Sequence, residues 1–257
     1  MIFHISSSKE AASHETFKII KTVVLAKRDA VLGLATGESL IRVYQLIVED
    51  RLKCGTVYDQ IQTINLDEYV TLPPNDPQSY YTFMSEHLFS PLGLALDRCH
   101  LPSGIAPDLE QECARYDKLI DSLPRDLQVL GIGQNSHIGF NEPGTSFSSR
   151  TQIVDLTKST IIANARFFPS VDMVPKKGIT MGIRDILQAK QIVLIAFGKQ
   201  KAEAVKMMSE GEIGPSRPAS ALRTHPNVHI IIDNDAASLL DIESLKKSHQ
   251  ISFENSL

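Results

Sequence analysis

The run Val129-Leu130-Gly131-Ile132 decides the fold class of this chain, because it carries no polar side chain on either face. A strand that is apolar on both faces is typical of a parallel sheet covered by helices on each side. Similar short runs recur along the chain and are separated by longer segments of helical period. The expected strands are residues 30–35, 61–66, 127–132, 191–197 and 228–232.

The segments between these strands repeat their apolar residues at helical spacing. Residues 10–27, with Phe17, Ile20 and Val24, and residues 39–53 show this period clearly. Alternating strands and helices predict an α/β fold, a single-domain open, mostly parallel sheet with helices on both faces. No internal repeat, low-complexity segment or long linker divides the chain, so we expect residues 1–257 to form one domain.

The composition is that of an ordinary globular protein. Of the 257 residues 42% are hydrophobic and 22% are charged, and the formal net charge is −4. These values exclude wholesale disorder. They also argue against a polyanion such as DNA, so no nucleic acid is expected as a partner.

Cysteine usage and hydropathy indicate a soluble cytoplasmic protein without a membrane partner. Cys54, Cys99 and Cys113 cannot all pair and show no C-x-x-C spacing, so we expect reduced thiols rather than a disulfide framework or a zinc site. The N-terminus lacks a basic segment followed by a long apolar one, and no stretch reaches about 18 uninterrupted apolar residues.

Ligands of an open parallel sheet bind beyond the carboxyl ends of its strands, so the residues after each strand are the first candidates. Thr36-Gly37-Glu38-Ser39 leads from a strand into a helix expected to begin near Ser39. Glycine allows close backbone approach, and a helix start offers unpaired N–H groups to a phosphate. The alternative is a tight turn with a Ser or Thr cap, which Glu38 favours unless its carboxylate turns outward.

A second candidate is the pair Asp67-Glu68, which follows the strand expected at residues 61–66. Adjacent carboxylates at a strand end can differ in environment, so that one is a general base and the other is hydrogen-bonded elsewhere. The alternative is an acidic loop or a helix cap.

The third candidate is the glycine-rich loop after residues 127–132, which offers His137, Asn141 and Glu142 before Pro143-Gly144. Histidine titrates near neutral pH, and a nearby carboxylate can tune it, so the loop is a candidate acid–base unit. The alternatives are a structural histidine or a metal pair. The five-residue separation of His137 and Glu142 does not fit a helical zinc pair.

Two cations complete the candidates. Arg166, and Lys201 beyond the strand at 191–197, could hold an anion, the arginine as a bidentate fork and the lysine as a point charge. The alternative for each is a solvated surface residue.

Taken together, these segments resemble the glucosamine-6-phosphate deaminase (isomerase) family, in order and without large gaps from about residue 36 to about residue 233. The residues that carry the resemblance are Asn65-Leu66-Asp67-Glu68-Tyr69, Ser79-Tyr80-Tyr81-Thr82-Phe83-Met84, His137-Ile138-Gly139-Phe140-Asn141-Glu142-Pro143-Gly144, Ser149-Arg150-Thr151, Asn164-Ala165-Arg166-Phe167-Phe168 and Pro175-Lys176-Lys177-Gly178-Ile179-Thr180-Met181-Gly182.

The resemblance implies a modified Rossmann-like sheet and conversion of glucosamine 6-phosphate and water to fructose 6-phosphate and ammonia, in amino-sugar catabolism and N-acetylglucosamine utilisation. It implies no cofactor and no metal. Asp67 would move the C2 proton, His137 would open the pyranose ring with Glu142 as its partner, and Asn135 would belong to the ring-opening unit. The phosphate-binding positions would be Thr36, Gly37, Ser39, Arg166 and Lys201.

The sequence also departs from the family pattern. Ser136 replaces a common glycine, and Glu38 stands where a small residue is usual. Allosteric hexameric members carry two basic residues where this chain has Gln152 and Val154, so we expect no activation by N-acetylglucosamine 6-phosphate. The family includes both monomers and homo-oligomers.

Three other functions compete with this interpretation. They are a deaminase of another amino-sugar phosphate such as galactosamine 6-phosphate, a 6-phosphogluconolactonase, and a non-catalytic phosphosugar sensor. Asp67-Glu68-Tyr69 and Asn141-Glu142-Pro143 favour the deaminase. A sensor would usually carry a helix-turn-helix, for which the residues before the strand at 30–35 leave no room.

Overall fold

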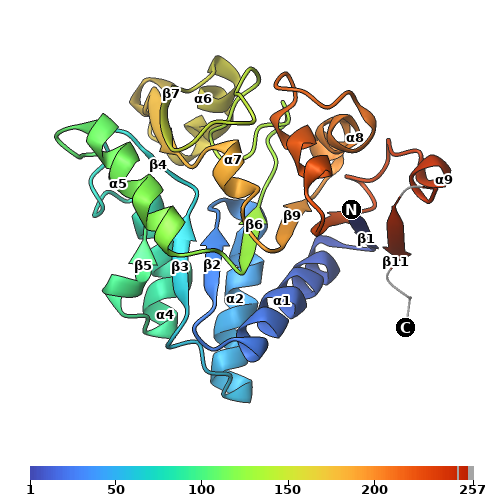
Figure 1. Ribbon diagram of the computed structural model, residues 1–257, viewed down its shortest axis with the longest axis horizontal. Helices are drawn as coiled ribbons and strands as arrows, with labels where there is room; N and C mark the ends of the chain where they lie inside the picture. Colours follow the sequence, from blue (N-terminus) through green and yellow to red (C-terminus); the bar gives the residue numbers. More distant parts are fainter. Residues whose placement is uncertain (248, 254–257) are drawn as a thin grey trace.

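The computed structural model describes residues 1–247 and 249–253. Within them, eight strands form one sheet in the order β11-β1-β10-β9-β6-β2-β3-β5, with every neighbouring pair parallel (Figure 1). The strands are β1 Ile2–Ser6, β2 Val31–Leu34, β3 Gln62–Asn65, β5 Cys99–His100, β6 Leu127–Leu130, β9 Ile192–Ala196, β10 Val228–Asp233 and β11 Gln250–Phe253.

The five strands expected from sequence are all present, with ends shifted by two residues at most. Every residue of β2, β6 and β9 is buried, as a strand covered on both faces must be. The prediction missed β1, β5 and β11. β5 has only two residues, and β11 is exposed over most of its length, so neither carries a strong apolar pattern.

Four longer helices are α1 Lys9–Ala26, α2 Glu38–Cys54, α5 Leu109–Ser122 and α8 Ala202–Glu210. α1 and α2 pack against each other, α1 against β10 and both against β9. The shorter helices are α3 Tyr80–Met84, α4 Ser90–Leu92, α6 Lys158–Asn164, α7 Ile183–Ile186 and α9 Ile242–Leu245. The Ser8 hydroxyl caps α1, and the Asp108 carboxylate caps α5 by accepting from a backbone N–H.

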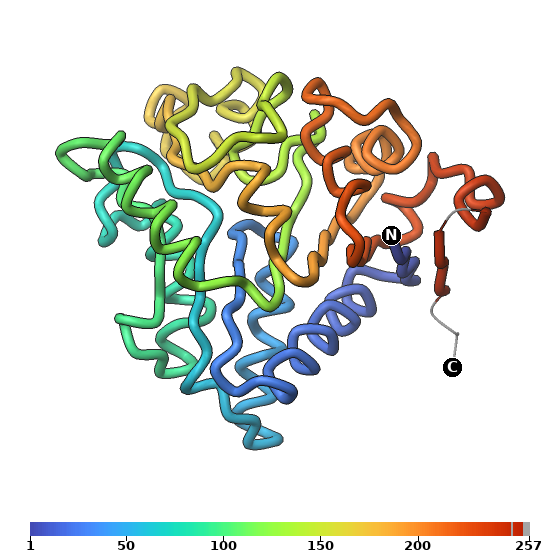
Figure 2. The backbone as a smooth tube through the Cα atoms, viewed as in Figure 1, coloured from blue at the N-terminus to red at the C-terminus, as the bar shows by residue number. Residues whose placement is uncertain are grey.

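A second, antiparallel sheet was not expected from the sequence. It has the order β4-β8-β7, with β4 Asp67–Tyr69, β8 Lys177–Thr180 and β7 Gln152–Asp155. These strands have three or four residues each, too few for a clear alternating pattern. The small sheet and α6 lie beyond the ends toward which β2 and β3 point (Figures 1 and 2). They therefore add a second wall at the carboxyl edge of the main sheet.

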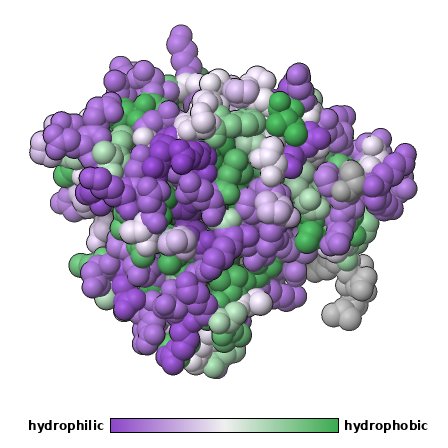
Figure 3. Space-filling model, in the orientation of Figure 1, coloured by the Kyte–Doolittle hydropathy of each residue, from purple (hydrophilic) through white to green (hydrophobic). Residues whose placement is uncertain are grey.

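One large apolar cluster joins the main sheet to α1, α2 and α5. A small separate cluster of Tyr69, Phe140 and Leu156 lies under the second sheet. On the face drawn in Figure 3 hydrophilic residues predominate and apolar residues form short patches between them. No helix in the described part of the chain is both long and apolar enough to cross a membrane.

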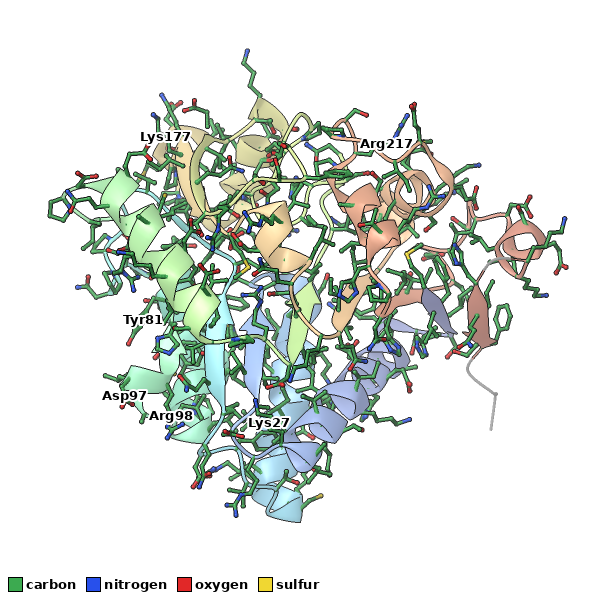
Figure 4. All side chains as sticks on the ribbon, in the orientation of Figure 1. Lys27, Tyr81, Asp97, Arg98, Lys177 and Arg217 are labelled. Atoms are coloured by element: carbon green, nitrogen blue, oxygen red, sulfur yellow. The ribbon has the colours of Figure 1, made fainter. Side chains whose placement is uncertain are left out.

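The two edges of the main sheet differ in their polar groups. At the amino-terminal edge the Asp126 carboxylate accepts hydrogen bonds from Lys27, Lys190 and the backbone N–H of Val31, which ties three segments together. Lys27 lies at that edge in Figure 4, whereas Lys177 and Arg217 lie beyond the opposite edge. The carboxyl edge carries the candidate site.

Candidate active site

A pocket of about 950 Å³ opens at the carboxyl edge of the main sheet. The loops that follow β2, β3, β6 and β9 contribute to its walls, as does the end of β10. Eight of the nine residues proposed from the sequence line it, namely Thr36, Gly37, Ser39, Asp67, Asn135, His137, Arg166 and Lys201. The ninth, Glu142, lies behind the pocket wall.

The strand order explains why the pocket is here. β2 and β6 are neighbours, but the chain leaves β2 toward β3 and leaves β6 toward β9, on opposite sides. The loops after β2 and β6 therefore diverge and leave a crevice, which is the usual ligand site of an open α/β sheet.

The loop after β2 forms one side of this crevice. Gly37 precedes α2 with φ 114°, a value that L side chains rarely adopt, and no side chain caps the helix start. The helix begins at Glu38, one residue earlier than expected. No hydroxyl group caps its first N–H groups. An uncapped helix start in a pocket is suited to an anion.

Lys201 approaches the same place from the loop after β9. Its ammonium donates a hydrogen bond to the carbonyl oxygen of Ile132, 2.7 Å away, in the loop after β6. Burial lowers the pKa of Lys201, and the positive charge of Arg166 lowers it further. The preceding turn is held by the Asp233 carboxylate, which accepts from the N–H of Gly198.

Arg166 lies in the 3-10 turn Ala165–Phe167, which follows α6. Its guanidinium is 3.2 Å from the Glu38 carboxylate, and it also lies over the ring of Phe167. Lys201, Arg166 and the start of α2 thus meet around one part of the pocket. We call Thr36, Gly37, Ser39, Arg166 and Lys201 the cradle.

Asp67 occupies a different part of the pocket and is 6% exposed. Within the described residues its carboxylate accepts no hydrogen bond, and it lies against Gly139, where an added Cβ would be 3.2 Å from Oδ2. Burial raises the pKa of Asp67 to about 8, and the charge of Glu68 adds to the effect. A carboxylate without partners, facing a pocket, is a candidate general base.

Glu68 is equally buried but fully used by the fold. Its carboxylate accepts hydrogen bonds from the backbone N–H groups of Tyr69, Tyr80 and Tyr81, at 2.8, 3.0 and 3.0 Å. Two of these donors belong to the first turn of α3, so Glu68 holds that helix start. The two adjacent carboxylates therefore lie in different environments, Glu68 bonded to backbone N–H groups and Asp67 facing the pocket.

His137, Asn135 and Glu142 form a connected group. Nδ1 of His137 lies 3.5 Å from Oε2 of Glu142, an ion-pair distance without normal hydrogen-bond geometry. The same oxygen accepts from the Asn135 amide at 2.6 Å, while Oε1 accepts from Thr157 at 3.1 Å and from Thr160. Burial raises the pKa of Glu142, but His137 and these donors outweigh it and lower the pKa to about 2.

The turn that carries His137 depends on two unusual positions. A Cβ at Gly133 would collide with the His137 ring, so the backbone at position 133 can approach the imidazole only if that residue is glycine. Ser136 has φ 69°, a left-handed conformation that glycine adopts more readily than serine.

The sequence analysis missed an aromatic wall and two hydroxyls. Tyr69, Tyr80, Phe140 and Phe168 have ring centroids 4.8–5.8 Å apart and border the pocket beside Asp67. The hydroxyls of Thr157 and Thr160 donate hydrogen bonds to Glu142, and Thr160 also lines the pocket. All four aromatic residues stood in the quoted motifs, so attention to apolar residues there could have found them. Nothing local marks the threonines.

The site offers a cradle for an anion, a buried carboxylate and a histidine held near an ionised glutamate. Among residues 1–247 and 249–253, no three His, Cys, Asp or Glu side chains are arranged to hold a metal ion. A parallel α/β sheet with these groups at its carboxyl edge defines an enzyme that moves protons on a small anionic substrate.

Comparison with known proteins then gives the family. The sequence model of the glucosamine-6-phosphate isomerases/6-phosphogluconolactonase family matches residues 6–230, so the chain belongs to this family. Glucosamine-6-phosphate deaminase of Geobacillus sp. (strain WCH70) is 48% identical over 94% of this chain and 96% of its own length. Glucosamine-6-phosphate deaminase 1 of Bacillus subtilis (strain 168) is 48% identical over 90% and 96%.

The solved structures agree with the fold. A monomeric glucosamine-6-phosphate deaminase superposes with a TM-score of 0.90 at 46% identity, over 92% of this chain and 99% of that one. The 6-phosphogluconolactonase of Trypanosoma brucei reaches a TM-score of 0.77 at only 16% identity, over 93% and 98%, and shows likeness of fold alone. The expected fold class and family resemblance are thereby confirmed.

Proposed function

We propose that this enzyme converts glucosamine 6-phosphate and water to fructose 6-phosphate and ammonia. Deaminases of this name are 48% identical over nearly the whole chain. One observation of the structure carries the proposal most directly. The pocket is lined by Asp67, whose carboxylate accepts no hydrogen bond within the described residues, by His137, which has Glu142 beside it at 3.5 Å, and by a cradle of two cations and a helix start.

The first step is the opening of the pyranose ring, which moves a proton from the O1 hydroxyl to the ring oxygen. An imidazole can accept and return this proton near neutral pH. The Glu142 carboxylate, ionised because it accepts from Asn135, Thr157 and Thr160, orients His137 and stabilises its protonated form. Asn135 orients the pair without titrating.

The second step moves a proton from C2 to C1 of the open-chain amino aldehyde. Asp67 takes the C2 proton while the aldehyde oxygen O1 gains a proton, which gives an enolamine. Asp67 then returns its proton to C1, the nitrogen lone pair forms the C2=N bond, and the amino group gives up one proton, which leaves an imine at C2 and a hydroxyl at C1. Water then adds to C2 and ammonia leaves, so the atoms balance. The raised pKa of Asp67 makes it a stronger base than a solvated carboxylate, and the aromatic wall limits the access of water.

The cradle binds the phosphate at the other end of the sugar. Phosphate contacts remote from the reacting carbons fix the orientation of C1 and C2 against Asp67 and His137. The helix start supplies N–H donors, Arg166 a bidentate fork and Lys201 a point charge.

The biological setting is part of the same proposal. The reaction belongs to amino-sugar catabolism and N-acetylglucosamine utilisation, in the cytoplasm, without a cofactor or metal. The solved relative at 46% identity is described as monomeric, which favours a monomer for this chain.

The test is an assay of ammonia and fructose 6-phosphate with three substrates. We expect both products from glucosamine 6-phosphate, with neither ammonia release from galactosamine 6-phosphate, whose ketose product would be the C4 epimer of fructose 6-phosphate, nor hydrolysis of 6-phosphogluconolactone at a comparable kcat/KM. Preferred turnover of galactosamine 6-phosphate or of the lactone would replace the proposal by that alternative. Tight binding of glucosamine 6-phosphate without any turnover would favour the sensor.

A further inference from the structure

Glu38 stands at the lip of the cradle, where a phosphate would have to pass. It is the first residue of α2 and lines the pocket, together with Gly37 and Ser39 on either side. Its carboxylate is the acidic group closest in the chain to the uncapped helix start. A fixed negative charge at this place repels a phosphate monoester, which carries a charge of about −1.5 to −2 near neutral pH.

The Glu38 side chain does not turn away from the pocket region but pairs with one of the two cations of the cradle. Its Oε2 lies 3.2 Å from a terminal nitrogen of Arg166. The two residues come from different elements, α2 and the turn after α6, and both line the pocket, so their ion pair joins two parts of its lining. Glu38 therefore pairs with the guanidinium group that a bound phosphate needs as a donor.

The ion pair has little value for the stability of the fold. The side chain of Glu38 is 50% exposed and that of Arg166 is 60% exposed, and exposed pairs of this kind contribute at most about 1 kcal/mol. Arg166 also has the ring of Phe167 beneath it, which holds the guanidinium without Glu38. Stability thus does not account for a carboxylate at this position.

We propose that Glu38 is an affinity-determining residue, an internal competitor that occupies Arg166 and weakens the binding of phosphate in the cradle. To bind, phosphate must share Arg166 with the Glu38 carboxylate or displace that carboxylate from it. Phosphate must also approach the negative charge of Glu38. Lys201 is not subject to this competition, because its hydrogen bond goes to a backbone carbonyl. The inference rests on the proposed phosphate-binding role of the cradle, but not on the amino-sugar chemistry.

The experiment measures binding of inorganic phosphate by titration calorimetry to the parent and to Glu38→Gln, beside the kinetics with glucosamine 6-phosphate. Removing one charge near a phosphate in a solvent-exposed cleft is expected to tighten the Kd of phosphate by about three- to ten-fold. The KM for glucosamine 6-phosphate should fall by a similar factor, with a smaller change in kcat. Glutamine keeps the size of the side chain, and a melting curve checks the fold.

Glu10→Gln is the matched control. Glu10 is also a glutamate in the first turn of a helix and also pairs with an arginine, Arg42 at 2.8 Å, but it does not line the pocket. Its replacement should leave the Kd of phosphate unchanged. If the Kd of phosphate for Glu38→Gln equals that for the parent, the inference is overturned. It is also overturned if Glu38→Gln binds phosphate more weakly, because Glu38 would then only position Arg166.

A double variant tests whether the effect runs through Arg166. In an Arg166→Met background, Glu38→Gln should tighten phosphate binding less than in the parent, since there is no guanidinium left to release. An equal gain in both backgrounds would contradict competition for Arg166. Phosphate binding does not need turnover, so the two proposals can fail separately. If the enzyme releases no ammonia, but Glu38→Gln binds phosphate more tightly than the parent, the proposed reaction is refuted and this inference stands.

Discussion

The two ends of the pocket handle charge in opposite ways. In the cradle, a helix start and the half-exposed Arg166 and Glu38 face solvent, and the charges are paired and screened. At the other end, Asp67 is buried without a hydrogen-bond partner and Glu142 is buried with three donors. The difference teaches that the end proposed for binding and the end proposed for proton transfer treat charge differently, the first with an exposed ion pair and the second with desolvated carboxylates.

The largest expected effect follows removal of the buried base. Asp67→Asn should lower kcat by about 10³–10⁴-fold, the upper range for loss of a general base, with little change in KM. Steady-state ammonia release measures it, and Asp29→Asn, an exposed aspartate before β2, is the control. Activity within a few-fold of the parent would show that Asp67 is not the base.

The same variant should be more stable than the parent at alkaline pH. The pKa of Asp67 is raised, so its contribution to folding stability is complete below its unfolded pKa near 4 and is lost as pH rises through about 8. Asparagine carries no charge at any of these pH values. The measurement is the melting temperature at pH 8 or above. If Asp67→Asn does not melt at a higher temperature than the parent there, burial does not raise the pKa of Asp67 as argued.

Loss of the ring-opening group is expected to be somewhat less severe. His137→Gln should lower kcat by about 10²–10³-fold, because the sugar ring also opens slowly without a catalyst. His14→Gln, on the exposed face of α1, is the control. A kcat close to the parent's would return His137 to the structural alternative.

Changes in the cradle should affect binding more than turnover. Lys201→Met removes one phosphate contact and should raise the KM for glucosamine 6-phosphate by about 10–100-fold, with a smaller fall in kcat. The neighbouring Lys199, which is exposed and outside the pocket lining, provides the control Lys199→Met. A fall in kcat with unchanged KM would contradict the assignment of substrate binding to one end of the pocket and proton transfer to the other.

The pH dependence sharpens the comparison further. The base must be ionised, so kcat/KM should rise with pH, about ten-fold per unit at most, up to the free-enzyme pKa of Asp67 near 8. The ammonium of bound substrate lowers this pKa, so the rise in kcat should lie at lower pH. An acid limb at the same pH in Asp67→Asn would assign the titration to another group.

The smallest effect concerns the strained turn before His137. Ser136→Gly removes a left-handed serine at φ 69° and should raise the free energy of unfolding by about 0.5–1 kcal/mol, measured by urea denaturation. Ser122→Gly, in the last turn of α5, should lower it instead. A loss of stability in Ser136→Gly would mean that the serine side chain contributes more than its backbone strain costs.

Much of the fold was predictable because its central strands are fully buried. β2 and β9 are apolar throughout and β6 is apolar except for Gln128, and this nearly continuous pattern is visible in the sequence. The small sheet was not predictable, because its three short strands pair residues as distant as Asp67 and Thr180. Such long-range pairings leave no local trace.

The candidate site was predictable where it depends on strand ends, and less so where it depends on contacts between elements. The order of strands and glycines places Thr36, Gly37 and the loop of His137 at one edge of the sheet. The ion pair between Glu38 and Arg166, and the hydroxyls of Thr157 and Thr160 on Glu142, join different elements and could not be read from either alone.

Asp67 and Glu68 show most clearly what each level decides. The sequence by itself determined that two carboxylates follow a strand and that one of them could be a base. The family resemblance assigned that role to Asp67. Only the tertiary structure decided the surroundings of the two carboxylates, because successive side chains of β4 point to opposite faces, Glu68 toward the N–H groups of α3 and Asp67 into the pocket. The position of a carboxylate in the chain is set by the sequence, but its pKa, and with it its charge at a given pH, is set by the groups that packing brings around it.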